Sequence, residues 1–208
     1  MSDALNYLLK ARPEAMGSYF KFLKEAGSHL DPKTRDLISV ITKVAVQTEP
    51  GFRQYLSRAL HGGCSANEVL DALLMAFPVL GLAKIVWATE ILLDMDIPEF
   101  RPERLDETPR WHNVAAMERI PLRETAYFDS DGRSLFVYRT EDEVYVYDSR
   151  CPHQVTNIPE LALEGQRLTC PKHQWAFDIE SGECVEKGNR PLTRFETKIA
   201  GEQLAAYW

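Results

Sequence analysis

Two short cysteine–histidine motifs limit what this chain can fold into. One residue separates Cys151 from His153, two separate Cys170 from His173, and sixteen residues lie between the motifs. Two thiolates and two imidazoles suit either zinc or an iron–sulfur centre. Tetrahedral zinc sites with two cysteines and two histidines are common. An iron–sulfur centre with two histidine ligands instead needs two similar loops, each supplying one sulfur and one nitrogen. The residues around the motifs must therefore distinguish the two metals.

Those surrounding residues predict short strands joined by turns. β-branched and aromatic residues favour strands at 135–139, 144–147, 166–169 and 175–178, and the turn signals lie at 129–132, 141–143 and 180–183. Each motif follows the end of a strand, where the chain reverses. Rigid strands would thus hold two ligand loops at the tip of a small all-β structure, near the surface.

Residues 1–97 show the helical period instead. Apolar residues recur at helical spacing, Asp31 before a proline predicts one helix start, and Ser65 with Glu68 forms a capping box at another. Pro78 should break or kink the helix that follows. Residues 98–110 lose the period and mix three prolines with charges, which is typical of an extended, solvated linker. We therefore expect an all-α domain at 1–97, a linker at 98–110 and an all-β domain at 111–208.

Composition disfavours several classes of partner. The formal charge of −7 argues against nucleic acid or an anionic membrane surface, and no apolar run is long enough to span a bilayer. The first ten residues lack the pattern of a secretory signal. Cys64 and Cys184 lie far apart in the sequence, so we expect free thiols in a reducing cytoplasm.

Residues 111–208 resemble a Rieske-type [2Fe–2S] ferredoxin domain. Residues 170–182 match the stretch that follows the second ligand pair in that family, and residues 188–192 lie where the family has a proline-containing loop over the cluster. The resemblance implies that Cys151 and Cys170 bind the inner iron, and that His153 and His173 bind the outer iron and pass the electron outward. It favours iron–sulfur over zinc, as does the one-residue spacing of the first motif, which is unusual for zinc fingers.

Three positions depart from that family's pattern. Val155 and Gln174 stand where the ligand loops commonly have glycine, and Trp175 stands where high-potential respiratory relatives have serine. Those relatives also carry an extra cysteine in each loop, which is absent here. Fewer hydrogen bonds to sulfur leave the reduced state less stabilised. The resemblance thus implies a reduction potential near the low end of the Rieske range, about −150 mV.

Residues 30–93 resemble the carboxymuconolactone decarboxylase family, which includes the AhpD-like alkylhydroperoxidases. The resemblance lies in residues 32–38 and 59–69. Active peroxidatic members carry a C-x-x-C-x-x-x-H motif, whereas residues 48–55 contain neither cysteine nor histidine, and only Asp36 falls near the place of an upstream acid. Without a thiolate there is no nucleophile for peroxide. The resemblance therefore implies an AhpD-like helical fold that oligomerises, without the peroxidase chemistry.

Together the two resemblances imply an electron-transfer protein rather than an enzyme. We expect a ferredoxin component that passes single electrons from a flavin-dependent reductase to an oxygenase, with the helical domain as a homo-oligomeric scaffold. In one alternative, the helical domain binds a small molecule or acts in a redox reaction fed by the Rieske domain. In another, the chain is itself an oxygenase, but the remaining histidines form no spaced pair for a mononuclear iron: His29, His61 and His112.

Overall fold

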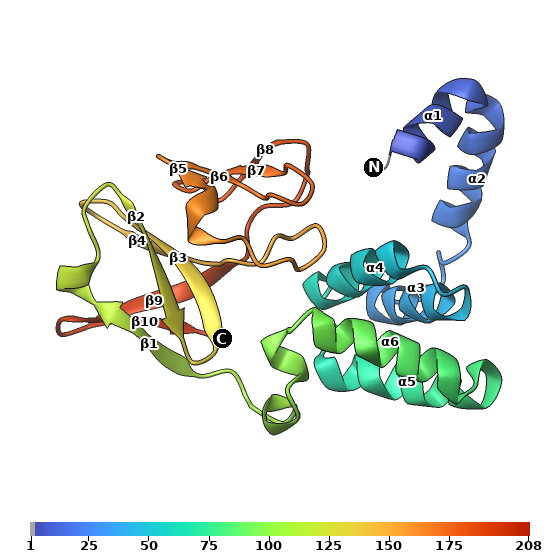
Figure 1. The fold of residues 1–208 in the computed structure, drawn as a ribbon, viewed down its shortest axis with the longest axis horizontal. Coiled ribbons are helices and arrows are strands. Elements are labelled where there is room, and N and C mark those ends of the chain that lie inside the picture. Colours follow the sequence, from blue (N-terminus) through green and yellow to red (C-terminus); the bar gives the residue numbers. More distant parts are fainter. Residues whose placement is uncertain (1–2) are drawn as a thin grey trace.

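A helical half and a β-rich half lie side by side in the molecule (Figure 1). The structure is a computed structural model and describes residues 3–208. The expected multi-domain architecture, all-α followed by all-β, is confirmed. Within the described residues, no helix is both long enough and apolar enough to cross a membrane.

In the described residues of the first half there are six α-helices, and two of them begin at the predicted caps. The side chain of Asp31 accepts a hydrogen bond from the Thr34 N–H, and Ser65 and Glu68 form the complete capping box. Both caps satisfy backbone N–H groups that a helix start would otherwise leave unpaired. The helices are α1 Asp3–Ala11, α2 Pro13–Glu25, α3 Pro32–Ala45, α4 Glu49–His61, α5 Ala66–Leu80 and α6 Leu82–Asp94.

Helices α3 to α6 pack around one apolar core, whereas α1 and α2 arch away from it (Figure 1). Pro78 does not break α5, which continues to Leu80 and ends before Gly81, whose φ is 78°. No described residue of α2 is buried. Large apolar side chains are therefore exposed on the first two helices: Tyr7, Leu8, Tyr19, Phe22 and Leu23.

The segment after α6 differs from the expected extended, solvated linker. It forms two 3₁₀ helices, η1 Pro98–Phe100 and η2 Pro102–Arg104. Phe100 is buried and Leu105 is half-buried, and both pack against the helical core. The prediction of an extended segment is wrong because the prolines favour tight helical turns, and because the apolar residues between the charges are buried against the helical core.

The second half contains a six-stranded and a four-stranded antiparallel sheet. The six-stranded order is β1-β10-β9-β4-β3-β2, and the four-stranded order is β5-β6-β7-β8. The strands are β1 Trp111–Ala116, β2 Thr125–Ser130, β3 Arg133–Arg139, β4 Val144–Asp148, β5 Leu163–Glu164, β6 Arg167–Thr169, β7 Ala176–Asp178, β8 Cys184–Glu186, β9 Arg194–Ala200 and β10 Gln203–Tyr207.

Strand β3 is buried on both faces and separates two cores. Phe136 and Tyr138 face the core shared with the small sheet, whereas Leu135 and Val137 face the core on the other side. This alternation is the period-two pattern of a strand. The two cysteine–histidine loops leave the ends of β4 and β6, as predicted, and their cysteines join the core of the small sheet.

Candidate metal centre

The four motif residues come together as one sulfur pair and one imidazole pair. Cys151 and Cys170 are each 1% exposed and lie in the same apolar core. The rings of His153 and His173 are half-buried, with centroids 4.5 Å apart and planes at 84°. The sulfur donors are thus inside the domain, and the nitrogen donors lie toward its surface.

Both ligand loops use the same backbone hydrogen bonds. In each loop, the N–H of the cysteine donates a 2.8 Å hydrogen bond to the carbonyl of the residue five positions later. The N–H of the residue four positions later donates a 2.9 Å hydrogen bond to the carbonyl of the cysteine. That fourth residue is Val155 in one loop and Gln174 in the other, with φ angles of 54° and 59°. These are the positions where the Rieske resemblance expects glycine. The left-handed backbone is therefore kept without glycine, at a cost of about 1–2 kcal/mol per residue.

The two thiols are close enough to share a proton. The hydrogen bond from Cys151 lowers the pKa of Cys170 to about 6, and the same bond raises the pKa of Cys151. The backbone N–H groups of Lys172 and His173 also point at the Cys170 sulfur and favour its thiolate. The lowered pKa of Cys170 favours its thiolate, which is the form of cysteine that binds metal.

His153 has an unpaired ring nitrogen. Burial, followed by the neighbouring His173, lowers its pKa to about 4, so its imidazole is neutral near pH 7. Its Nδ1 is buried and has no hydrogen-bond partner within the described part of the chain. The ring stacks on Trp175 at 4.8 Å and 14°, which fixes its orientation. A neutral, oriented imidazole with a free buried nitrogen is suited to bind a metal.

This donor set fits a two-iron cluster. Among residues 3–208, no three His, Cys, Asp or Glu side chains converge so as to hold a single metal ion. A Rieske cluster takes its protein ligands as two pairs, with sulfur on one iron and nitrogen on the other. One sulfur pair and one nitrogen pair are present here, and the unpaired Nδ1 of His153 belongs to the nitrogen pair.

The loop at residues 188–192 covers the sulfur pair, as the resemblance implies. Leu192 is buried in the core that contains both cysteines. Gly188 lies so close to Trp175 that a Cβ at this glycine would collide with the indole ring. The Arg190 guanidinium lies 5.9 Å from the centroid of the same ring. Water is therefore kept from this side of the cysteines.

The helical half holds the first ligand loop from the other side. The Ser57 hydroxyl on α4 donates to the Pro152 carbonyl over 3.2 Å, and Val155 packs into the helical core. The Arg150 guanidinium donates to the carbonyls of Met95 and Asp96 just beyond α6. No sequence signal marks Ser57 as part of the site, because nothing in a local pattern records a contact between domains.

An ion-pair network strengthens the same junction. Arg133 on β3 pairs with Asp148, three residues before Cys151, and with Glu99 of η1. Burial raises the pKa of Glu99, but the charge of Arg133 and its hydrogen bond outweigh this and hold that pKa below 4.5. The chain before the first ligand is thus fixed to the segment that links the two halves.

The helical half's other candidate residues have structural roles. Asp36 is buried beside Arg58, with 2.9 Å between carboxylate and guanidinium. Burial raises the pKa of the Cys64 thiol, which disfavours a nucleophilic thiolate. Cys184 and Cys64 are both free, as expected. Residues 48–55 contain no cysteine or histidine that could act as a peroxidase residue. Asp36, the candidate upstream acid, forms an ion pair with Arg58.

The three remaining histidines do not meet. His29 is exposed after α2. His112 stacks on Trp208 with centroids 4.2 Å apart and lies 2.9 Å from Asp131, within the β-rich half. His61 ends α4, where its Nδ1 lies 2.7 Å from the Ser57 carbonyl. This carbonyl contact is the kind expected of a histidine at a helix end.

Comparisons with known proteins match the two halves separately. The model of the Rieske [2Fe-2S] domain matches residues 110–196, and that of the carboxymuconolactone decarboxylase family matches residues 13–94. The ferredoxin component of the naphthalene 1,2-dioxygenase/salicylate 5-hydroxylase systems of Ralstonia sp is 30% identical over 87 residues, which is 42% of this chain and 81% of that protein. The ferredoxin component of the naphthalene 1,2-dioxygenase system of Pseudomonas aeruginosa is 28% identical over 98 residues, 47% of this chain and 94% of that protein.

One solved structure is the ferredoxin of carbazole 1,9a-dioxygenase from Nocardioides aromaticivorans IC177. It is 23% identical, and the match covers 48% of this chain and 97% of that one, with a TM-score of 0.35. Each of these three matches covers less than half of this chain, and the helical half is matched by its own family model.

Proposed function

The chain belongs to the Rieske [2Fe–2S] family through residues 110–196 and carries a carboxymuconolactone decarboxylase family domain before them, and on this premise we propose that it is a one-electron carrier. Cys151 and Cys170 hold the inner iron, and His153 and His173 hold the outer iron. The observation that carries this assignment is the buried sulfur pair beside a half-exposed imidazole pair, in which Nδ1 of His153 has no protein partner among the described residues.

When bound, the cluster supplies a one-electron redox centre. The chain's own residues prepare its place. The buried cysteines and Leu192 exclude water from the sulfur side. Trp175 fixes the ring plane of His153. The ring of His173 is half-buried, so this one side chain would connect the cluster to the solvent and offer the electron a way out. Backbone N–H groups aimed at Cys170 favour its negative charge and so support metal binding.

The partners we propose are a flavin-dependent reductase and an oxygenase component. This proposal is supported by what the relatives are, since both are ferredoxin components of aromatic dioxygenase systems. The absence of a G-x-G-x-x-G stretch after a strand is also consistent with electrons arriving from a separate reductase. We place the protein in the cytoplasm, a proposal supported by Cys64 and Cys184, which form no disulfide.

Electron uptake by the intact protein tests this role. The holoprotein is mixed with NADH and a catalytic amount of a flavin-dependent ferredoxin reductase, and bleaching of its visible absorbance is titrated. We expect one electron per chain, and re-oxidation when an oxygenase component of a naphthalene dioxygenase system is added. A His173→Ala chain should show neither. Uptake of no electron by the wild-type holoprotein would contradict the proposal.

For the helical domain we propose a homo-oligomeric scaffold. The support is the apolar surface left uncovered within one chain, which includes Tyr7 and Phe22 on α1 and α2 and Leu74 and Met75 on α5. The contacts made by Ser57 and the linker indicate that each Rieske domain would be docked on this scaffold rather than tethered loosely. Sedimentation equilibrium of the full chain tests the idea, and a monomer at micromolar concentration would refute it.

A further inference from the structure

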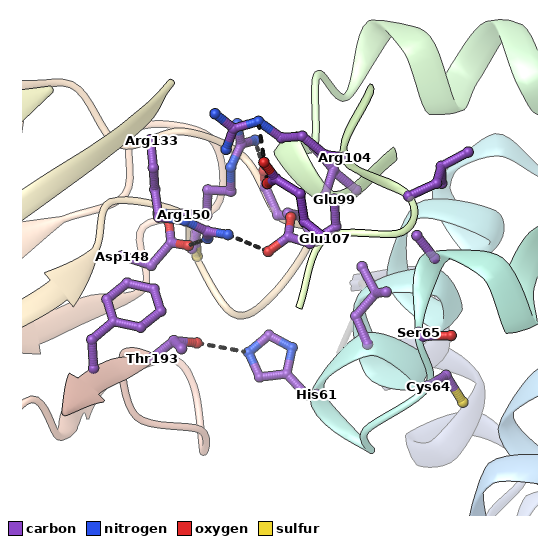
Figure 2. Close-up of a pocket in the computed structure, with 17 residues that line it drawn as sticks. His61, Cys64, Ser65, Glu99, Arg104, Glu107, Arg133, Asp148, Arg150 and Thr193 are labelled. Carbon is purple, nitrogen blue, oxygen red and sulfur yellow. Dashed lines mark hydrogen bonds and ion pairs between the residues drawn. The ribbon is translucent and has the colours of Figure 1, made fainter. Parts of the chain in front are cut away.

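A pocket of about 440 Å³ lies between the two halves (Figure 2). It is far larger than the water-sized voids of a packed protein interior, and it falls in the size range of small-molecule sites. Its apolar lining comes from α4, α5, the segment just after α6, the first cysteine–histidine loop and β9: Leu60, Ala66, Ile97, Cys151, Val155 and Phe195.

The charged side chains of the pocket already make polar contacts within the protein. Arg133 pairs with Glu99 and Asp148. Arg104 pairs with Asp131, and Arg150 donates to backbone carbonyls. Glu107 lies within 4.0 Å of Arg104. Each of these charged side chains therefore already contacts the protein, although Nε of Arg133 has no partner among the described residues, and an uncharged ligand would leave these contacts in place.

His61 supplies one hydrogen-bond acceptor at the apolar end. Its Nδ1 is 2.7 Å from the Ser57 carbonyl, and since a carbonyl only accepts, Nδ1 must carry the proton. Burial also lowers the pKa of His61, which favours the neutral ring. Nε2 therefore carries a lone pair. It contacts Thr193 in the wall of the pocket, with 3.4 Å between Nε2 and Oγ1, a long and weak hydrogen bond (Figure 2).

We propose that this pocket binds a neutral, largely apolar molecule with one hydroxyl donor, such as a phenol, which donates to Nε2 of His61. The apolar body would lie between the halves, and the hydroxyl would replace the long contact with Thr193. The site goes beyond the role in electron transfer, because nothing in that role requires a ligand here. It differs in position from residues 48–55, where the peroxidatic members of the helical family have their cysteines.

The binding of two probes to the holoprotein tests the proposal. 2-Naphthol carries the hydroxyl, and 2-methoxynaphthalene has nearly the same shape but no donor. Equilibrium dialysis of each probe should show that 2-naphthol binds with a dissociation constant below about 1 mM. The loss of one hydrogen bond should make 2-methoxynaphthalene bind about fivefold more weakly.

Three variants locate the binding. His61→Leu removes the acceptor and should weaken 2-naphthol about fivefold, whereas His61→Gln keeps an acceptor oxygen and should retain part of the binding. His29→Leu changes an exposed histidine outside the pocket and should bind as the wild type does. The visible spectrum of each variant reports whether the metal centre is intact, so a folding defect is recognised. If His61→Leu is defective, the affinity of His61→Gln for 2-naphthol decides whether His61 is the acceptor.

Several results would overturn the proposal. These are no binding of 2-naphthol, equal binding of the two probes, unchanged binding by both His61 variants, or equal loss in the His29 control. Electron uptake by the same holoprotein is measured separately. A failure of the pocket therefore leaves the electron-carrier proposal standing, and the reverse is also true.

Discussion

The Ser57 hydroxyl in the helical half donates a hydrogen bond to the carbonyl of Pro152, which lies between Cys151 and His153. The two residues are 95 positions apart, the bond is 3.2 Å long, and both groups are buried. The helical domain therefore contacts the peptide chain between Cys151 and His153 directly. A carboxymuconolactone decarboxylase family domain without cysteine or histidine at residues 48–55 thus supports the candidate metal centre of the neighbouring domain.

Ser57→Ala should destabilise the holoprotein by about 1–3 kcal/mol, because it leaves the Pro152 carbonyl buried without its donor. The urea midpoint, followed by the visible absorbance of the cluster, measures the loss. Ser39→Ala is the matched control, since that hydroxyl donates to the Arg35 carbonyl within α3. This control should change the midpoint little, because alanine is a better helix former. Equal effects of both substitutions would contradict the role of Ser57.

At position 155, replacement by glycine should cost no more than replacement by alanine. Val155 is buried in the helical core yet holds a φ of 54°. Both substitutions lose apolar burial, but only glycine relieves the left-handed strain of roughly 1–2 kcal/mol. Urea unfolding of Val155→Gly and Val155→Ala gives the order. The same pair at buried Val44, inside α3, should show the opposite, with glycine worse by about 1 kcal/mol. The same order at both positions would argue against strain at Val155.

The ion pair at Glu99 should make stability depend on pH in the acid range. Arg133 holds the pKa of this carboxyl below its ordinary 4.5, so the stabilisation is fully present above that pH and is lost as the pH falls through the folded-state value. The carboxylate side chain is 45% exposed, so screening limits the effect to under about 1 kcal/mol. The Tm difference between wild type and Glu99→Gln should shrink below pH 4.5. A difference that is constant or grows there would contradict the ion-pair account.

The reduction potential should lie near the low end of the Rieske range, about −150 mV. Trp175 stacks on His153 and brings no hydroxyl to the position where high-potential relatives have serine. Fewer donors to sulfur leave the extra negative charge of the reduced cluster less stabilised. Protein-film voltammetry gives the potential directly. A value above roughly +100 mV would require hydrogen bonds that this loop does not provide.

Local signals in the sequence predicted much of this structure. The caps at Asp31 and Ser65 were recognisable because capping chemistry involves residues three positions apart. The strands that carry the ligand loops followed from turn signals and alternating residues. The positions of Val155 and Gln174 were marked by the glycines that they replace, and their positive φ angles give the physical reason for those glycines.

The junction between the halves could not be predicted in the same way. The sequence predicts a solvated linker because prolines are interleaved with charges and the helical period stops, but Phe100 packs into the helical core and Glu99 pairs with Arg133. His61 was correctly expected to bond a helix-end carbonyl, while its second nitrogen faces a residue 132 positions away. Periodicity describes one element at a time, so contacts between distant surfaces leave no trace in it.

The metal and sulfide content of the purified chain tests the central claim most directly. Iron, zinc and acid-labile sulfide are measured per chain in the wild type and in Cys170→Ser, which removes one of the two buried sulfur donors. We predict a red-brown protein with about two irons and two sulfides per chain and no zinc, and loss of both iron and sulfide in the variant. A colourless wild-type protein with one zinc and no sulfide would contradict the account.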